Sequence, residues 1–394
     1  MRKGVHLPRR SLLQHLPVRI QTRLHDAARA MRLHRYRRLR DAAPIALVGT
    51  HDLSPSGAPR VALDVAQVLH ASGYRIVVVS MVDGPLRADF ERLDALILID
   101  LLPARRRPYL RRLAAHAEIA FVNTYMAAAL VDAWAKHVPT CWYLHELSAF
   151  ADLAATGIFD SPLTGAARIW AGSELCARLV RPYRDDVVVL PYGLEPIREV
   201  PGRAPDERSD DPLRIAVFGS IEPRKGQDLA LDGLVMLDPA DRVRMRLRVY
   251  GRPLDPVFAR DVVQRCDVIA EASFEGELDH AGYRAALVDN DAILVSSRED
   301  TAPLTSIDAL SAGRMLLLTR AIGTSAWLDD GVDALIEEQA DAAGMARLFQ
   351  RALAAKPRAT EIGAAARMRF EAVFSRGAFA RRIHTEIIVA KSKT

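Results

Sequence analysis

The sequence predicts an α/β protein with two domains, each built around a doubly wound parallel sheet. Three observations support this prediction. The chain of 394 residues is too long for one ordinary hydrophobic core. Short apolar runs alternate with amphipathic stretches along most of its length, as strands alternate with helices in parallel sheets. The alternation stops once, at the polar segment 199–211, and then starts again.

The first domain is expected over residues 44–198. A helix at 61–71 is expected to end at Gly73, and strands are expected at 45–48, 76–80, 95–99, 119–123, 140–144, 169–171 and 187–190.

The second domain is expected over residues 212–375. Residues 199–211 are rich in proline, glycine and charge and lack apolar periodicity, which predicts a linker. Beyond it, strands are expected at 213–218, 246–250, 292–296 and 315–319, and helices at 230–237 and 262–270. Residues 376–394 predict a C-terminal helix that packs back on the first domain. Two Rossmann-like halves joined in this way enclose a cleft in which ligands bind.

A basic extension precedes the first domain at residues 1–43. Residues 1–40 contain twelve Lys or Arg and one acid, so the net charge of +5 belongs to this extension and the remainder is slightly acidic. Apolar residues at about helical spacing predict a basic amphipathic helix. Such a helix can lie on an anionic membrane; a solvated arm that packs on the body or on a partner is the alternative. Nucleic acid is not expected as a partner, because the body is acidic and offers no interleaved aromatic residues.

Other features favour a cytoplasmic protein. No apolar run approaches the ~20 residues that span a bilayer. Cys141, Cys176 and Cys266 form no CxxC pair, which argues against a disulfide framework or zinc site and fits a reducing compartment. Peripheral contact with the inner face of the membrane stays open through the extension.

Two motifs of the first domain contain candidate ligand-binding residues. Residues 50–80 place Gly57 between a strand and a helix, where a missing side chain lets backbone N–H groups approach a ligand. An ordinary βα turn is the alternative. In WYLHEL, residues 142–147, a strand ends in His145 and Glu146, whose side chains can point into the cleft. The alternative is a structural histidine paired with a carboxylate.

Two motifs of the second domain contain charged candidates. FGSIEPRKGQD, residues 218–228, follows the first strand and contains Lys225, a compact cation suited to a diphosphate. Residues 295–331 contain two carboxylates separated by seven residues, Asp300 and Asp308. A loop lies between them, and a helix is expected to begin near Ser306.

The four motifs, in this order, resemble glycosyltransferase family 4 on the GT-B fold, over residues 44–390. The resemblance implies that Lys225 holds the donor diphosphate, that Asp300 and His145 contact the donor sugar, and that Asp308 contacts the ribose. It gives Lys225, Asp300 and His145 as the catalytic residues, and as donor-binding residues Gly57, Gly219, Ser220, Arg224, Glu299, Thr301, Ala302, Pro303, Leu304, Thr305 and Asp308.

The sequence departs from the family at several of these positions. Ser220 stands where many members have arginine, so one phosphate-binding cation is either absent or supplied by Arg224. Asp300 and Asp308 stand where glutamate is usual, and aspartate reaches one methylene less. Asp308 therefore reaches less far towards the ribose than the usual glutamate does.

The resemblance implies a retaining, metal-independent glycosyltransferase that uses a nucleotide-sugar donor. Membrane docking by the basic extension would suit a glycan or lipid-linked acceptor, in cell-envelope polysaccharide biosynthesis. No cofactor or metal is expected, and the D-x-D at 289–291 is expected to precede the strand at 292. A GT-B epimerase or phosphorylase and a non-catalytic scaffold are alternatives. A dehydrogenase is disfavoured because no GxGxxG opens either half. Nucleotide, sugar and acceptor stay open.

Overall fold

The computed structural model describes residues 31, 34, 43–99, 107–197 and 211–392. The predicted basic extension therefore lies outside the described residues, apart from Met31, His34 and Ala43. The predicted linker also lies outside them, apart from Asp211.

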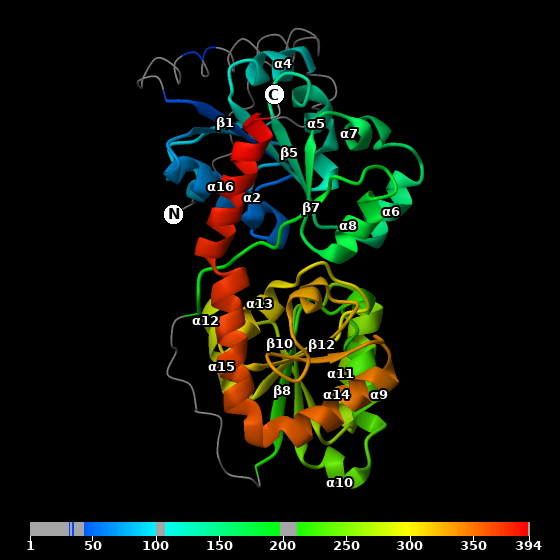
Figure 1. Cartoon of the computed structure of the whole chain (residues 1–394). Helices are drawn as coiled ribbons and strands as arrows, with labels where there is room; N and C mark the ends of the chain where they lie inside the picture. Colours follow the sequence, from blue (N-terminus) through cyan, green and yellow to red (C-terminus); the bar gives the residue numbers. More distant parts are fainter. Residues whose placement is uncertain (1–30, 32–33, 35–42, 100–106, 198–210, 393–394) are drawn as a thin grey trace, which may run out of the picture.

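The first domain contains a seven-stranded parallel sheet with the strand order β3-β2-β1-β4-β5-β6-β7 (Figure 1). Its strands are β1 (Ile45–Thr50), β2 (Arg75–Ser80), β3 (Leu96–Ile99), β4 (Ile119–Asn123), β5 (Thr140–Leu144), β6 (Arg168–Ala171) and β7 (Val188–Val189). Its helices are α2 (Gly57–Ala71), α3 (Arg87–Glu91), α4 (Arg107–Ala114), α5 (Ala128–Trp134), α6 (Ser148–Ala154), α7 (Asp160–Thr164) and α8 (Glu174–Val180). Every residue of β1, β2, β4 and β5 is buried, because helices cover both faces of a parallel sheet.

The second domain contains a six-stranded parallel sheet with the order β10-β9-β8-β11-β12-β13. Its strands are β8 (Leu213–Phe218), β9 (Met245–Tyr250), β10 (Ala272–Gly276), β11 (Ala292–Val295), β12 (Met315–Thr319) and β13 (Leu335–Glu337). Its helices are α9 (Gln227–Val235), α10 (Pro239–Arg242), α11 (Pro256–Val268), α12 (His280–Asp289), α13 (Leu304–Ser311), α14 (Ala342–Ala355) and α15 (Ala359–Arg369). In both sheets the strand order reverses beside the first strand of the domain, between β1 and β4 and between β8 and β11.

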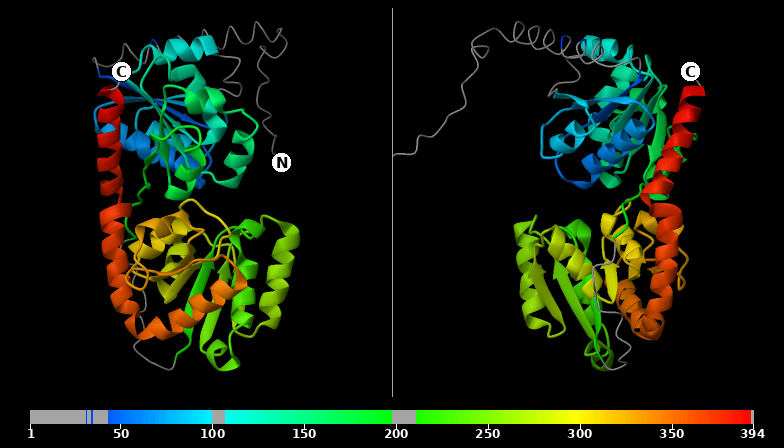
Figure 2. Two further views of the ribbon diagram at one scale, coloured as in Figure 1. Left: turned by 45° about the vertical axis from the view of Figure 1, so that its right-hand side comes forward. Right: turned by 90° about the vertical axis from the view of Figure 1, so that its left-hand side faces the viewer.

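The chain crosses between the domains a second time near Ser375. A π-helical turn (Phe370–Phe374) ends α15, and α16 (Arg376–Ser392) then lies along the first domain (Figures 1 and 2). The two crossing segments pair with each other, since the Leu194 amide donates to the Phe374 carbonyl at 2.8 Å and the Arg376 amide donates to the Leu194 carbonyl at 2.9 Å. This two-stranded crossing is the only connection that the described residues show between the domains along the backbone.

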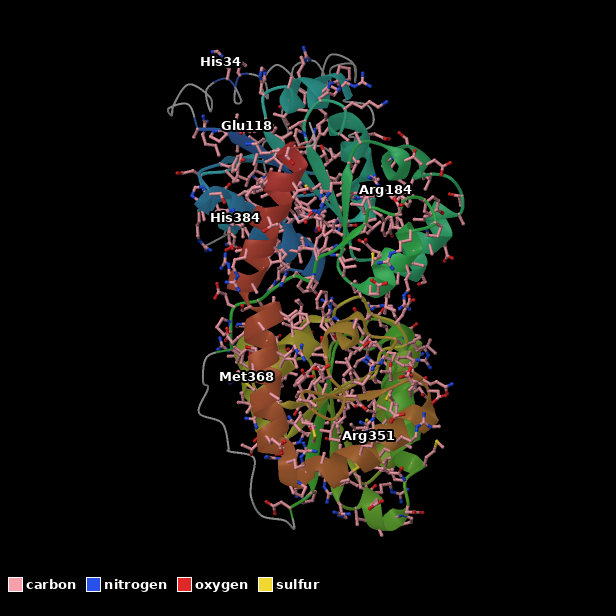
Figure 3. All side chains as sticks on the ribbon, viewed as in Figure 1. His34, Glu118, Arg184, Arg351, Met368 and His384 are labelled. Carbon is pink, nitrogen blue, oxygen red and sulfur yellow. The ribbon has the colours of Figure 1, made fainter. Side chains whose placement is uncertain are left out.

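Ion pairs fix α16 to the first domain. Arg168 of β6 contacts Glu386 at 2.5 Å, and Lys391 contacts Glu118 at 2.6 Å. Figure 3 labels Glu118 together with His384, whose ring nitrogens lie within hydrogen-bonding distance of the Ser72 hydroxyl. The last helix thus belongs structurally to the domain that begins the chain.

Candidate active site

The largest part of the predicted site surrounds one cavity between the two domains, of about 510 Å³, which we call the central cavity. A second cavity of about 680 Å³, the hinge-side cavity, lies next to it between α2, the crossing segment and helices α12 and α13. Gly57, Leu304 and Thr305 line both cavities, so the two adjoin at these residues.

Most of the predicted site residues line the central cavity: Gly57, His145, Gly219, Arg224, Lys225, Glu299, Asp300, Thr301, Ala302, Pro303, Leu304 and Thr305. Asp308 lines the hinge-side cavity instead. Ser220 lines neither of the two; its hydroxyl donates to Glu222 Oε1 at 2.8 Å. The fold therefore brings together residues from four separated motifs and leaves Ser220 beside them.

Lys225 is held in place by close contacts behind it. It ends a short 3₁₀ turn (Pro223–Lys225) and is followed by Gly226, whose φ of +66° favours glycine. A Cβ on Gly226 would lie 2.1 Å from the Ser296 carbonyl oxygen, so no other residue fits. The Ser296 hydroxyl donates to the Lys225 carbonyl at 2.8 Å. The turn is thereby fixed against the end of β11, with the Lys225 side chain towards the cavity.

Asp300 faces Lys225 from the loop after β11. Its amide donates to the Ala321 carbonyl at 3.2 Å, and its carbonyl accepts from Gly323 at 2.8 Å. Asp300 Oδ2 accepts hydrogen bonds from Lys225 Nζ at 2.6 Å and from Arg224 Nη1 at 3.2 Å. Two cations thus converge on one carboxylate at the cavity wall.

Helix α13 begins at the cavity and starts two residues earlier than the sequence suggested. Its first residues are Leu304 and Thr305, not Ser306, and no side chain caps it. The first amides of a helix have no partner within the helix, and its dipole is positive at that end. The amides of Leu304 and Thr305 can therefore bind an anion in the cavity.

Helix α2 begins on the opposite side of the cavity. Gly57 is its first residue, and no side chain caps this helix either. A Cβ built on Gly57 would meet no heavy atom within 4 Å. Packing within the protein therefore does not require glycine here; its missing side chain leaves space in the cavity itself.

His145 follows β5, and its side chain is only 10% exposed. Its Nε2 is buried without a hydrogen-bond partner among the described residues, and the nearest carboxylate oxygen, Glu146 Oε1, lies 3.6 Å away. Burial lowers the pKa of His145 below its ordinary value, so the ring is neutral at pH 7. A neutral imidazole beside the cavity can donate a hydrogen bond to a ligand or accept one from it.

Two contacts join the domains at the edge of the central cavity. The Thr301 hydroxyl donates to the His145 carbonyl at 2.6 Å, and the Ser148 hydroxyl donates to Glu299 Oε1. The loop that carries Asp300 is therefore in direct contact with the first domain.

Asp308 lies one helical turn into α13. The Tyr283 hydroxyl donates to Asp308 Oδ2 at 2.7 Å, and burial raises the pKa of Asp308 to about 6 although this hydrogen bond opposes the shift. Tyr283 also packs edge-on against Phe218, with ring centroids 5.0 Å apart. The carboxylate is thus partly neutral near pH 6 and faces the hinge-side cavity.

Sequence reasoning missed Tyr192, which lines the central cavity from the first domain. Tyr192 lies in residues 189–195, for which the sequence predicts no site residue. Its position directly before the predicted linker is the signal that could have marked it as a cleft residue. Among the described residues, no group of three or more His, Cys, Asp or Glu could hold a metal ion.

Comparison with known proteins agrees with this geometry. Residues 203–369 match the family model described as glycosyl transferases group 1. No curated protein sequence matches the chain. Among solved structures, HepE of Anabaena in complex with UDP has a TM-score of 0.71 at 15% identity, covering 88% of this chain and all of that one.

Two further structures have the same architecture. Sucrose-phosphate synthase of Thermosynechococcus elongatus has a TM-score of 0.69 at 16% identity, covering 90% of this chain and 100% of that chain. WaaG, a glycosyltransferase involved in lipopolysaccharide biosynthesis, has a TM-score of 0.62 at 12% identity, covering 86% of this chain and 99% of that chain. Likeness at these identities shows the fold. The chain has the GT-B fold that the sequence predicted, and its second domain carries the sequence signature of glycosyl transferases group 1.

Proposed function

We propose that the chain is a retaining, metal-independent glycosyltransferase that transfers a sugar from a nucleotide-sugar to a glycan or lipid-linked acceptor. One observation carries the proposal: Lys225, Asp300 and the first turns of α2 and α13 converge on one cavity between the domains. The family match over the second domain and the UDP bound to HepE support a nucleoside-diphosphate donor.

The positive groups of the central cavity suit the diphosphate of such a donor. Lys225, Arg224 and the amides of Leu304 and Thr305 would stabilise the negative charge that develops when the nucleoside diphosphate leaves. These groups already line the cavity, and Lys225 and Arg224 would exchange Asp300 for the phosphate oxygens when the donor binds. The ribose would then lie towards Asp308 in the hinge-side cavity.

The donor sugar would lie between His145 and Asp300, which line the same cavity from opposite domains. Asp300 would accept hydrogen bonds from sugar hydroxyls, and neutral His145 can donate a hydrogen bond to the sugar or accept one from it. The bond from the anomeric carbon to the phosphate oxygen breaks, and the bond to the acceptor oxygen forms on the same face. The acceptor's proton passes to the departing phosphate.

Metal independence rests on the positions of the charged groups. The two acids of the D-x-D, Asp289 and Asp291, precede β11 at the opposite end of the sheet from the cavity, where Arg214 and Arg248 hold them. Lys225, Arg224 and the two helix starts would do the electrostatic work that Mg²⁺ does in other transferases.

The decisive experiment is a substrate screen. Purified protein is tested by thermal shift with UDP-, GDP- and dTDP-sugars, and donors that stabilise it are then incubated with saccharide and lipid-linked acceptors in EDTA. We expect release of nucleoside diphosphate that depends on the acceptor, and NMR of the product should show the anomeric configuration of the donor. A strict Mg²⁺ requirement or an inverted product contradicts the proposed mechanism. An epimerised sugar without transfer indicates the epimerase alternative, and no nucleotide binding indicates the scaffold.

We further propose a peripheral role at the cytoplasmic face of the membrane, in envelope polysaccharide synthesis. The charge and apolar spacing of residues 1–40 support it, as does the fold shared with WaaG. No helix among the described residues is long and apolar enough to cross a membrane. Co-sedimentation should show binding to vesicles with anionic lipid that weakens with salt and is lost when residues 1–40 are deleted. Equal binding to neutral vesicles contradicts this proposal.

A further inference from the structure

Asp300 neutralises the same cations that suit the donor's diphosphate. Asp300 Oδ2 lies 2.6 Å from Lys225 Nζ and 3.2 Å from Arg224 Nη1, and all three side chains line the central cavity. The side chains of Asp300 and Lys225 are only 15% and 18% exposed, so water screens their charges less than it does at a surface. Any anion that binds Lys225 and Arg224 must also approach the Asp300 carboxylate.

A bare nucleoside diphosphate and an intact nucleotide-sugar differ in what they offer this carboxylate. Both bring negative phosphates to the two cations, and both are repelled by Asp300. The intact donor also brings sugar hydroxyls, which donate hydrogen bonds to a carboxylate. The bare diphosphate brings no such donors. It draws the cations away from Asp300 and leaves that half-buried carboxylate with fewer partners.

We propose that Asp300 makes the site select the intact nucleotide-sugar over the free nucleoside diphosphate; this inference rests on the proposed function. The carboxylate weakens binding of the diphosphate alone, and the sugar hydroxyls offset this cost. After transfer the sugar has moved to the acceptor, so the repulsion is no longer offset. Asp300 then favours release of the product and keeps that product from occupying the site.

Glu299 provides a matched comparison within the same loop. It is the adjacent acid and lines the same cavity, but its carboxylate accepts from the Ser148 hydroxyl of the first domain. Neutralising Glu299 changes the charge of the cavity by the same amount without removing the partner of Lys225 and Arg224. The two substitutions therefore separate a local effect at the cations from a general effect of charge.

The test measures affinities by isothermal titration of wild type, Asp300→Asn and Glu299→Gln. The probes are UDP, GDP, dTDP, inorganic pyrophosphate and the nucleotide-sugar that the substrate screen selects. We expect Asp300→Asn to bind its nucleoside diphosphate about tenfold more tightly, the size of one partly screened ion pair. It should bind the intact donor no better than wild type and should transfer sugar more slowly. Glu299→Gln should gain less affinity for the diphosphate than Asp300→Asn does, because Glu299 pairs with Ser148 while Asp300 pairs with Lys225 and Arg224.

Each other result has a definite meaning. The inference is overturned if Asp300→Asn binds the diphosphate no more tightly than wild type, or if Glu299→Gln gains as much. The inference alone fails under a specific combination of results. In that case wild type binds a nucleoside diphosphate and Lys225→Ala weakens this binding, but Asp300→Asn does not strengthen it. If no probe binds wild type or Asp300→Asn, the proposed function fails with it. A damaged site would lose affinity for all probes. Should Asp300→Asn fold poorly, Asp300→Ser repeats the test, since the loop's bonds to Ala321 and Gly323 use only the backbone.

Discussion

Gly57 is a residue whose missing side chain serves the cavity rather than the fold. A Cβ there would meet no protein atom within 4 Å, and the residue begins a 15-residue helix. Gly57→Ala should therefore leave the free energy of unfolding within about 0.5 kcal/mol of wild type. The added methyl group would lie where the donor is expected, so we expect donor affinity to fall by about tenfold.

Gly377→Ala is the matched control for Gly57→Ala. Gly377 is also in the first turn of a helix, away from the cavity, and a Cβ there would lie 3.6 Å from Arg381 Nη1. Titration of the donor against both variants should show a loss for Gly57→Ala alone. An unchanged donor affinity in Gly57→Ala would remove Gly57 from the binding site.

Asp64 should make the stability of the protein depend on pH. It faces the hinge-side cavity, and burial raises its pKa to about 7, although Arg376 and Arg60 oppose the shift. The ordinary pKa of this carboxyl, as in the unfolded chain, is 3.8. Between these two values the folded chain binds the extra proton, so Asp64 costs increasing stability as pH rises and the full amount above pH 7.

The substitution Asp64→Asn removes this cost. Thermal unfolding should show Asp64→Asn to be more stable than wild type by at least about 1 kcal/mol at pH 8, since each unit of pKa difference corresponds to about 1.4 kcal/mol. The advantage should disappear near pH 4, where the carboxyl is protonated in both states. A difference of equal size at both pH values would show that ionisation of Asp64 is not the cause.

At the scale of elements, ion pairs hold the last helix, α16, on the first domain. The ion pair between Arg168 and Glu386 is well covered, with side chains only 16% and 14% exposed, while the pair between Lys391 and Glu118 is 40% and 51% exposed. Removing one partner of a covered pair leaves the other charge without compensation. Glu386→Ala should therefore destabilise the protein by about 2 kcal/mol, and Lys391→Ala by less than about 1 kcal/mol.

Denaturant unfolding of both variants checks the role of α16. The larger loss of unfolding free energy is expected for Glu386→Ala, because its ion pair with Arg168 is less exposed than that of Lys391 with Glu118. Equal small losses would mean that α16 does not hold Glu386 against Arg168 in solution.

The sequence predicted the central elements of both sheets because their residues are buried on both faces. β1, β4, β5 and β12 are continuous apolar runs, which is how such strands read in a sequence. The edge strands β10 and β13 were not predicted, because β10 reads ASFEG and β13 has three residues. α2 begins four residues before its predicted start, since Gly57 and Pro59 are typical of loops but are tolerated in a first helical turn.

The candidate site was predictable as a set of motifs and not as a set of contacts. The order of residues predicted that Lys225 and Asp300 lie at strand ends on one edge of the sheet. In the structure Lys225 Nζ lies 2.6 Å from Asp300 Oδ2. The hydrogen bonds of Thr301 with His145 and of Ser148 with Glu299 join residues about 150 positions apart, and no local pattern signals them. Ser220 occupies a position that the resemblance assigns to the donor site, but its hydroxyl donates a hydrogen bond to Glu222.

At the scale of the whole molecule, the two crossings and the two hydrogen bonds at the cavity edge enclose the cleft from opposite sides. This arrangement places both domains around one cavity, with the cations supplied by the second domain and the space at Gly57 by the first. The proposed function therefore depends on Lys225 acting on a ligand within that cleft.

The most direct test of this role of Lys225 is the rate of nucleoside diphosphate release from the selected donor. The rate is measured for wild type and Lys225→Ala, in EDTA with acceptor present. Lys225→Ala should keep its fold by circular dichroism, because the Lys225 side chain lines the cavity and Asp300 keeps its hydrogen bond with Arg224. We predict a rate reduced by about 10²–10³, the usual cost of removing one group that stabilises developing negative charge. A folded Lys225→Ala that turns over at nearly the wild-type rate would contradict the account.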